Sequence, residues 1–169
     1  VVIVVRTFFF QAFYIPSASM EPTLKKNDRV LVNKLSYHLH DVHRGDIVVF
    51  DRPTCKQANT PAWATCDSAT AIKDLIKRAI GLPGDTITVQ NDHVYIDGKL
   101  LNEPYVHQLP TRGICSFPGT YKIPKGDVFV MGDNRTNSTD GRCFGPIPKR
   151  IIVGRAFVRV WPLSRLAFL

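Results

Sequence analysis

The sequence has four cysteines but no CxxC pair, so it lacks the spacing of a structural zinc site. It also contains no zinc-finger pattern, no RNP motif and no glycine-rich phosphate loop, and nothing therefore indicates a specific nucleic-acid or nucleotide site. Internal repeats and low-complexity tracts are missing as well. From these absences we expect no metal ion, no cofactor and no nucleic-acid partner.

Acidic residues are few, 14 against 22 lysines and arginines, in a chain of 169 residues. With 44% hydrophobic and 21% charged residues, the composition is that of a folded protein, and the length suits one domain with a small insertion. The basic excess fits an anionic lipid surface, a nucleic acid or an ordinary solvated face, because charge alone names no partner. Its two clusters are Lys25, Lys26, Arg29 and Lys34, and then Lys149, Arg150, Arg155, Arg159 and Arg165.

No hydrophobic run is long enough to span a bilayer, which takes about 20 apolar residues. The chain nevertheless opens with apolar residues at 1–5, 8–10 and 12–15. We interpret residues 1–15 as the end of a transmembrane or membrane-associated segment whose earlier part precedes Val1. The alternative is an N-terminal strand of the core.

Helical periodicity is scarce, and short β-branched segments between turn residues predict a mostly antiparallel β fold. Residues 71–80 are ambiguous alone, but the turn sequence at 81–85 favours a strand. Residues 100–118 contain prolines and little alternation, so we expect a small inserted subregion, about 91–124, within a β domain of residues 16–169. The expected strands are 29–35, 46–50, 71–80, 86–89, 93–96, 127–131 and 155–161.

The spacing of the cysteines leaves their pairing open. If the domain works outside the cytoplasm, the short loop between Cys55 and Cys66 favours that pair. Whether Cys115 and Cys143 pair stays open, and free buried thiols are the alternative.

Two serines, Ser17 and Ser19, lie in the polar stretch 17–23 directly after Pro16. Proline keeps this backbone extended, so both hydroxyls point to the same side. One hydroxyl can attack a carbonyl while the other donates a hydrogen bond to the oxyanion, a contribution of about 2.7 to 4 kcal/mol. The alternative is a serine-rich turn that caps a short helix beginning at Pro22.

A serine nucleophile needs a base, and the five histidines show no partner pattern beside these serines. A lysine can serve if burial lowers its pKa from about 10.4 toward neutrality. Lys77 has the most apolar neighbours of any lysine, in the sequence Leu-Ile-Lys-Arg-Ala-Ile, although Lys73 also stays a candidate. The alternative for Lys77 is an exposed position on a strand.

A dense polar segment at 132–142 follows the apolar strand expected at 127–131. Its side chains can orient a base through hydrogen bonds, and Asp140 can pair with Arg142 or Arg135 to hold the segment. The alternative is a solvent-exposed turn.

Four segments in this order, 15–24, 44–50, 77–85 and 132–142, resemble the conserved boxes of bacterial type I signal peptidases. The resemblance implies an antiparallel β-sheet catalytic core of the type shared with self-cleaving SOS repressors. It also implies a membrane-bound serine endopeptidase that removes signal peptides from exported preproteins at the extracytoplasmic face of the bacterial plasma membrane. Its partners would be preproteins and membrane lipid, and we expect a monomer.

Two other functions are weighed against this one. A self-cleaving repressor with Ser/Lys chemistry would carry a DNA-binding helical domain before the serine, where this chain has residues 1–15. A non-catalytic extracytoplasmic β-rich binding module would use the same boxes as structural loops.

The resemblance also implies roles for individual residues. Ser19 matches the nucleophile and Lys77 the general base, while the Ser17 side chain and the Ser19 backbone amide match the oxyanion donors. Thr136 and Gly141 depart from the aspartate and serine usual at their positions, and the stretch 55–66 belongs to no box. The residues that match the support of the dyad are Ser138, Asp140 and Arg142, and those that match the apolar substrate subsites are Phe13, Ile15, Met20, Leu24, Leu75 and Ile76.

Overall fold

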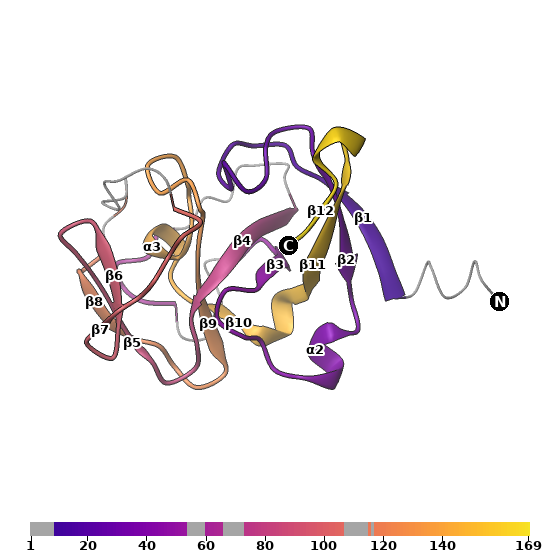
Figure 1. Ribbon diagram of the computed structural model, residues 1–169. Coiled ribbons are helices and arrows are strands. Elements are labelled where there is room, and N and C mark those ends of the chain that lie inside the picture. Colours follow the sequence, from indigo (N-terminus) through magenta and orange to yellow (C-terminus); the bar gives the residue numbers. More distant parts are fainter. Residues whose placement is uncertain (1–8, 54–59, 66–72, 107–114, 116) are drawn as a thin grey trace.

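Two antiparallel sheets make up the computed structural model, which describes residues 9–53, 60–65, 73–106, 115 and 117–169 (Figure 1). The larger sheet has eight strands in the order β1-β2-β11-β3-β4-β9-β10, with β12 paired to β11. These strands are β1 (Phe10–Tyr14), β2 (Arg29–Asn33), β3 (Ile47–Asp51), β4 (Asp74–Gly81), β9 (Asp127–Met131), β10 (Ile147–Pro148), β11 (Ile152–Trp161) and β12 (Ala167–Phe168).

A smaller sheet of four strands, in the order β7-β6-β5-β8, lies beside the larger one at the left of Figure 1. It is formed by the chain between β4 and β9, and β5 and β6 pair as the expected hairpin. Its strands are β5 (Thr86–Gln90), β6 (His93–Ile96), β7 (Lys99–Leu100) and β8 (Thr120–Lys122). The short helical turns are α2 (Ser36–Leu39), α3 (Gly141–Phe144), η1 (Lys149–Ile151) and η2 (Leu163–Arg165).

The prediction of a mostly antiparallel β fold is confirmed, and each expected strand is present, two of them with the predicted bounds and the others with bounds shifted by one to three residues. The β-branched and aromatic residues of these strands fill three buried clusters. One cluster lies around Val30, Ile47 and Ile15, and a second lies around Phe50 and Val130. The third joins the two sheets, because it combines residues of β4 and β9 with residues of β5, β6 and the segment after β8.

The described part of the predicted membrane segment 1–15 is mainly a strand. Phe10–Tyr14 form β1, an edge strand of the larger sheet whose side chains are mostly exposed. Residues 1–8 lie outside the described residues. Within the described ranges, no helix combines the length and the apolar character needed to cross a bilayer.

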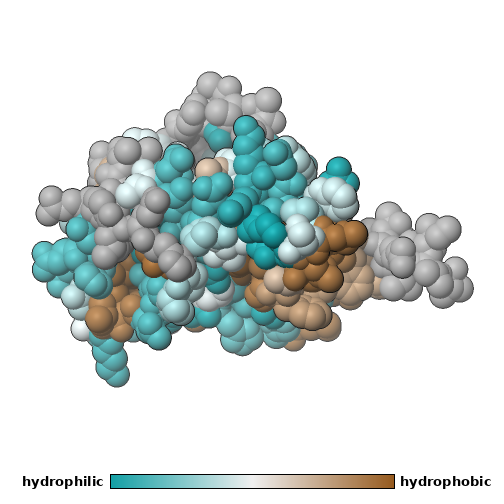
Figure 2. Space-filling view, turned by 45° about the horizontal axis from the view of Figure 1, so that its top comes forward, coloured by the Kyte–Doolittle hydropathy of each residue, from teal (hydrophilic) through white to brown (hydrophobic). Residues whose placement is uncertain are grey.

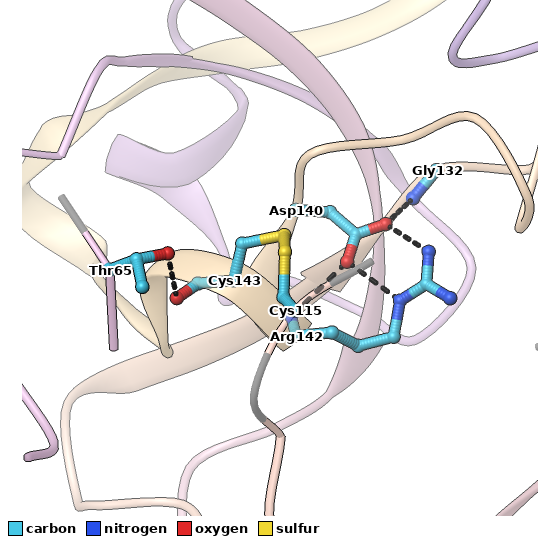
Figure 3. Close-up of a disulfide and its surroundings, with 6 residues drawn as sticks. All are labelled: Thr65, Cys115, Gly132, Asp140, Arg142 and Cys143. Carbon is cyan, nitrogen blue, oxygen red and sulfur yellow. Dashed lines mark hydrogen bonds and ion pairs between the residues drawn. A yellow bond between two sulfur atoms is a disulfide. The ribbon is translucent and has the colours of Figure 1, made fainter. Parts of the chain in front are cut away.

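A disulfide joins Cys115 to Cys143, so the alternative of free thiols is wrong for these two residues (Figure 3). Cys143 lies in α3, and its carbonyl oxygen accepts hydrogen bonds from the amide and the hydroxyl of Thr65. The pair favoured from sequence, Cys55 and Cys66, lies outside the described residues.

Candidate active site

Ser19 lies in the loop between β1 and β2. The Ile15 amide donates to the Asp28 carbonyl at 2.9 Å, which closes the base of the loop. Met20 and Leu24 have no exposed surface and anchor the loop in the first core cluster. As a result Ser19 is held in the interior, with only 8% of its surface exposed.

Lys77 lies on β4 with its amine directed at this serine. Lys77 Nζ is 2.7 Å from Ser19 Oγ and 3.0 Å from the Ile76 carbonyl oxygen. Burial lowers the pKa of the Lys77 amine to about 8, although the negative charges of Asp140 and Asp133 oppose the shift. The amine therefore loses its proton at mildly alkaline pH while it lies within hydrogen-bonding distance of a hydroxyl.

The two candidate lysines differ in their burial. Lys77 is 4% exposed, so the alternative of an exposed strand lysine is wrong, whereas Lys73 is exposed and directly precedes β4. Ser17 Oγ lies 3.3 Å from Ser19 Oγ, so the two hydroxyls face the same space as predicted, although the backbone bends at Ser17 and Ala18 and turns at Ser19.

The polar segment 132–142 carries a buried ion pair, and the alternative of a solvent-exposed turn is wrong for Asp140 and Arg142, whereas Thr136 and Asn137 are exposed. Asp140 accepts from Arg142 Nε at 2.9 Å and Nη2 at 2.8 Å, and from the Gly132 amide at 2.9 Å (Figure 3). Burial alone would raise the pKa of Asp140, but the Arg142 guanidinium and the Gly132 amide hold it below its usual value. Of the two partners considered for Asp140, Arg142 is the one observed, and Arg135 pairs with Glu103.

Ser138 is buried beside the backbone of the serine loop. A Cβ built on Gly132 would lie 2.2 Å from Ser138 Oγ and 2.4 Å from the Ser19 carbonyl oxygen. Only glycine leaves room for this approach, because real Cβ contacts are never so short. The hydrogen bonds of Lys77 go to Ser19 and Ile76, so a contact of Ser138 with the lysine stays a prediction.

The sequence did not reveal the contacts that bind this segment to the serine loop. Arg78 donates to Asp133 through Nε at 2.8 Å and Nη2 at 2.6 Å, and the Thr23 hydroxyl donates to the same carboxylate at 2.6 Å. The Asn134 amide donates to the Ser19 carbonyl at 3.1 Å. Opposite charges in two neighbouring boxes were a signal for the Arg78 pair, but 55 residues separate its members.

A cavity of about 250 Å³ opens beside Ser17 and Lys77, between the segment 13–17 and residues 73–77 at the start of β4. Its lining includes four residues expected at apolar subsites: Phe13, Ile15, Leu75 and Ile76. The other two, Met20 and Leu24, lie in the core and are not among the described residues that line the cavity. In the part of the chain that the structure describes, no three His, Cys, Asp or Glu side chains gather to hold a metal ion.

The family model of signal peptidase, peptidase S26, matches residues 1–161 of this chain. The chain belongs to that family. It is 43% identical to a probable signal peptidase I-2 of Synechocystis sp., with 98% of this chain and 69% of the relative covered. It is 35% identical to a signal peptidase I of Bacillus caldolyticus, with 99% of this chain and 88% of the relative covered.

A solved structure supports the same relationship. The crystal structure of a signal peptidase I from Enterococcus faecalis matches with a TM-score of 0.50 and 27% sequence identity. The match covers 69% of this chain and 97% of that chain. Family membership confirms the resemblance found in the four boxes and the prediction of a serine endopeptidase of the signal peptidase type.

Proposed function

We propose that Ser19 and Lys77 form the catalytic dyad of a peptidase that cleaves signal peptides from preproteins. The observation that carries this proposal is the 2.7 Å distance between Ser19 Oγ and the buried Lys77 Nζ. A base of this kind must be uncharged, and the lowered pKa of Lys77, about 8, supplies a neutral amine close to physiological pH.

In the proposed mechanism, neutral Lys77 accepts the hydroxyl proton as Ser19 Oγ attacks the scissile carbonyl carbon. The negative charge then develops on the former carbonyl oxygen, where the Ser17 hydroxyl and the Ser19 amide can donate hydrogen bonds. Protonated Lys77 passes its proton to the departing amine, which leaves Ser19 acylated. Water, deprotonated by Lys77, releases the acyl group and returns the serine to its starting state.

The strand arrangement supports a peptide substrate that binds in extended form. β3 pairs with β4 from Asp74 to Arg78 on one edge, and on the other edge β9 pairs only from Arg78 to Gly81. Among the described strands, none covers that second edge over residues 74–77, which also border the cavity. A signal peptide could add a strand there and place small side chains against Ile15, Leu75 and Ile76.

Two features support action at the outer face of a membrane. Figure 2 shows an apolar surface at the right-hand end, on the side where β1, β11 and β12 lie in Figure 1. Exposed apolar side chains on these strands and on the turn between β11 and β12 suit contact with lipid; they are Phe10, Tyr14, Trp161, Leu163, Leu166 and Phe168. The Cys115–Cys143 disulfide suits an oxidising compartment. The proposed mechanism uses residues of a single chain and needs no second subunit, which suits the expected monomer.

The test is cleavage of a purified preprotein that has small residues one and three positions before the cut. The protein, incubated with it in detergent, should release a mature chain whose new N-terminus is located by mass spectrometry. The Ser19→Ala variant should bind the preprotein and release nothing. Cleavage by Ser19→Ala at the wild-type rate would overturn the proposal, and binding without cleavage by the wild type would favour a binding module.

A further inference from the structure

The segment that follows β7 reaches from the smaller sheet toward the site. Leu101 and Tyr105 pack against the third core cluster, which ties the segment to β5 and β6. Between them lies Glu103, whose side chain is 10% exposed. The Tyr105 hydroxyl donates to Glu103 Oε1 at 3.1 Å and so fixes the direction of the carboxylate.

Glu103 binds an arginine of the polar segment 132–142. Arg135 Nη1 donates to Glu103 Oε2 at 3.0 Å, and Nη2 donates to Oε1. The Arg135 side chain has no exposed surface, and its Nε donates to the Gly132 carbonyl at 3.0 Å. Burial alone would lower the pKa of Arg135, but Glu103 raises it above its usual value, so the guanidinium stays charged.

The same segment also restrains the residue next to Gly132. The Tyr105 ring lies under the Arg78 guanidinium, 4.0 Å from its centre, and Arg78 binds Asp133 with two hydrogen bonds. Arg135 therefore holds Gly132, and Arg78 holds Asp133. Glu103 binds Arg135 and the Tyr105 ring packs on Arg78, so both restraints depend on the segment after β7.

Gly132 connects these restraints to the backbone of Ser19. Its Cα lies so close to the Ser19 carbonyl oxygen that an added Cβ would be 2.4 Å away, and its amide binds Asp140. A small displacement of Gly132 thus moves the backbone of the serine, and a misplacement of about 1 Å can cost a rate factor of about 100. We propose that Glu103 is a positioning residue for the Ser19–Lys77 reaction, acting through Arg135 and Gly132. The proposal rests on the function proposed above.

The test compares Glu103→Ala, Glu103→Gln and Tyr105→Phe with the wild type, using kcat per active site titrated with an irreversible serine acylator. Titration counts only the folded, active molecules. A residue with a merely structural role would change their number and leave the kcat of each molecule unchanged. The cavity is lined by residues 13–17 and 73–77 and not by this segment, so KM should stay within about twofold. The fall in kcat should be roughly 10- to 100-fold for Glu103→Ala, smaller for Glu103→Gln, and smallest for Tyr105→Phe, which keeps the ring on Arg78.

Asp85→Asn is the matched control, because Asp85 is also a shielded carboxylate bound to an arginine, Arg44, at 3.0 Å. It should lower the melting temperature and leave kcat per titrated site unchanged. The proposal is overturned if Glu103→Gln, which keeps the shape of the side chain, lowers only the melting temperature. Failure of the proposed function is distinguishable from failure of this proposal, because Ser19→Ala would then still cleave the preprotein.

Discussion

Two adjoining regions of the site bury positive charge in opposite ways. In the first, which we call the paired region, three shielded arginines each face a carboxylate: Arg78–Asp133, Arg135–Glu103 and Arg142–Asp140. In the second, Lys77 is 4% exposed and faces the Ser19 hydroxyl and the Ile76 carbonyl, with no described carboxylate at ion-pair distance. Each carboxylate compensates the buried charge of its arginine and makes the pair structural, whereas burial of Lys77 without a paired carboxylate favours the neutral amine that a general base requires.

The strongest test of this contrast removes the unpaired cation. Lys77→Met replaces the amine with an apolar chain of similar size, and we expect kcat/KM to fall by a factor of about 10⁴ or more, as when other serine hydrolases lose a dyad or triad member. The melting temperature should stay equal or rise, because the folded state no longer carries a desolvated amine. Lys122→Met, which changes an exposed lysine of β8, is the control and should retain full activity. A large loss of stability in Lys77→Met would contradict the contrast.

Breaking an arginine–carboxylate pair of the paired region should instead reduce the stability of the fold. Asp140→Asn leaves Arg142 buried without its carboxylate, and we expect the free energy of unfolding to fall by about 3 to 5 kcal/mol. Because the charge of Asp140 raises the pKa of Lys77, its removal should also shift the pH midpoint of activity downward. Urea denaturation and a pH–rate series measure the two effects. The more exposed Arg44–Asp85 pair is the reference, and Asp85→Asn should cost about 1 kcal/mol or less.

The disulfide should matter for stability more than for chemistry. Cys143 lies in α3 directly after Arg142, and the bond to Cys115 closes a loop with a sequence separation of 28 residues. For a loop of this length, loss of the crosslink in Cys143→Ser should reduce the free energy of unfolding by about 3 to 4 kcal/mol. The Ser19–Lys77 contact is formed by other elements, so kcat should change by less than about threefold at temperatures well below the melting point. A loss of kcat without a loss of stability would show that the paired region and the dyad are not separable.

The smallest of these changes adds one methyl group where the two regions meet. Gly132→Ala forces the Ser19 carbonyl and Ser138 apart, and we expect kcat to fall by about 100-fold while the paired region stays folded. Gly81→Ala is the control, because its Cβ would collide with the end of the Ile123 side chain at the junction of the two sheets. It should reduce stability and spare kcat. Equal effects of the two variants on kcat would argue that the rate depends on general packing.

The contrast also explains which parts of the site could be predicted from the sequence. The contact between Ser19 and Lys77 could be anticipated from the family resemblance of the four boxes, whereas local features alone left a serine-rich turn and Lys73 as alternatives. Seven strands could be predicted from local features, since their β-branched runs end at turn residues. The Arg135–Glu103 pair could not, because its members are 32 residues apart and both types are usually exposed.

Pairing of cysteines and burial in the core are decided by the tertiary structure. The favoured pair Cys55–Cys66 lies outside the described residues and stays a prediction, whereas the Cys115–Cys143 disulfide, which the sequence spacing left open, is observed. Met20, expected at a substrate subsite, packs in the first core cluster together with Ile15 and Ile76, but it does not line the cavity that those two residues border, so its subsite role stays a prediction. The spacing of residues along the sequence predicts neither which cysteines pair nor which side chains enter the core.

The central claim, that Lys77 acts as a neutral base, is tested most directly by the pH dependence of kcat/KM between about pH 6 and pH 10. Because only the deprotonated amine can accept the serine proton, the rate should rise tenfold per pH unit at low pH and level off above a midpoint near the Lys77 pKa of about 8. A rate independent of pH across this range, or a midpoint near the ordinary lysine value of about 10.4, would contradict the account.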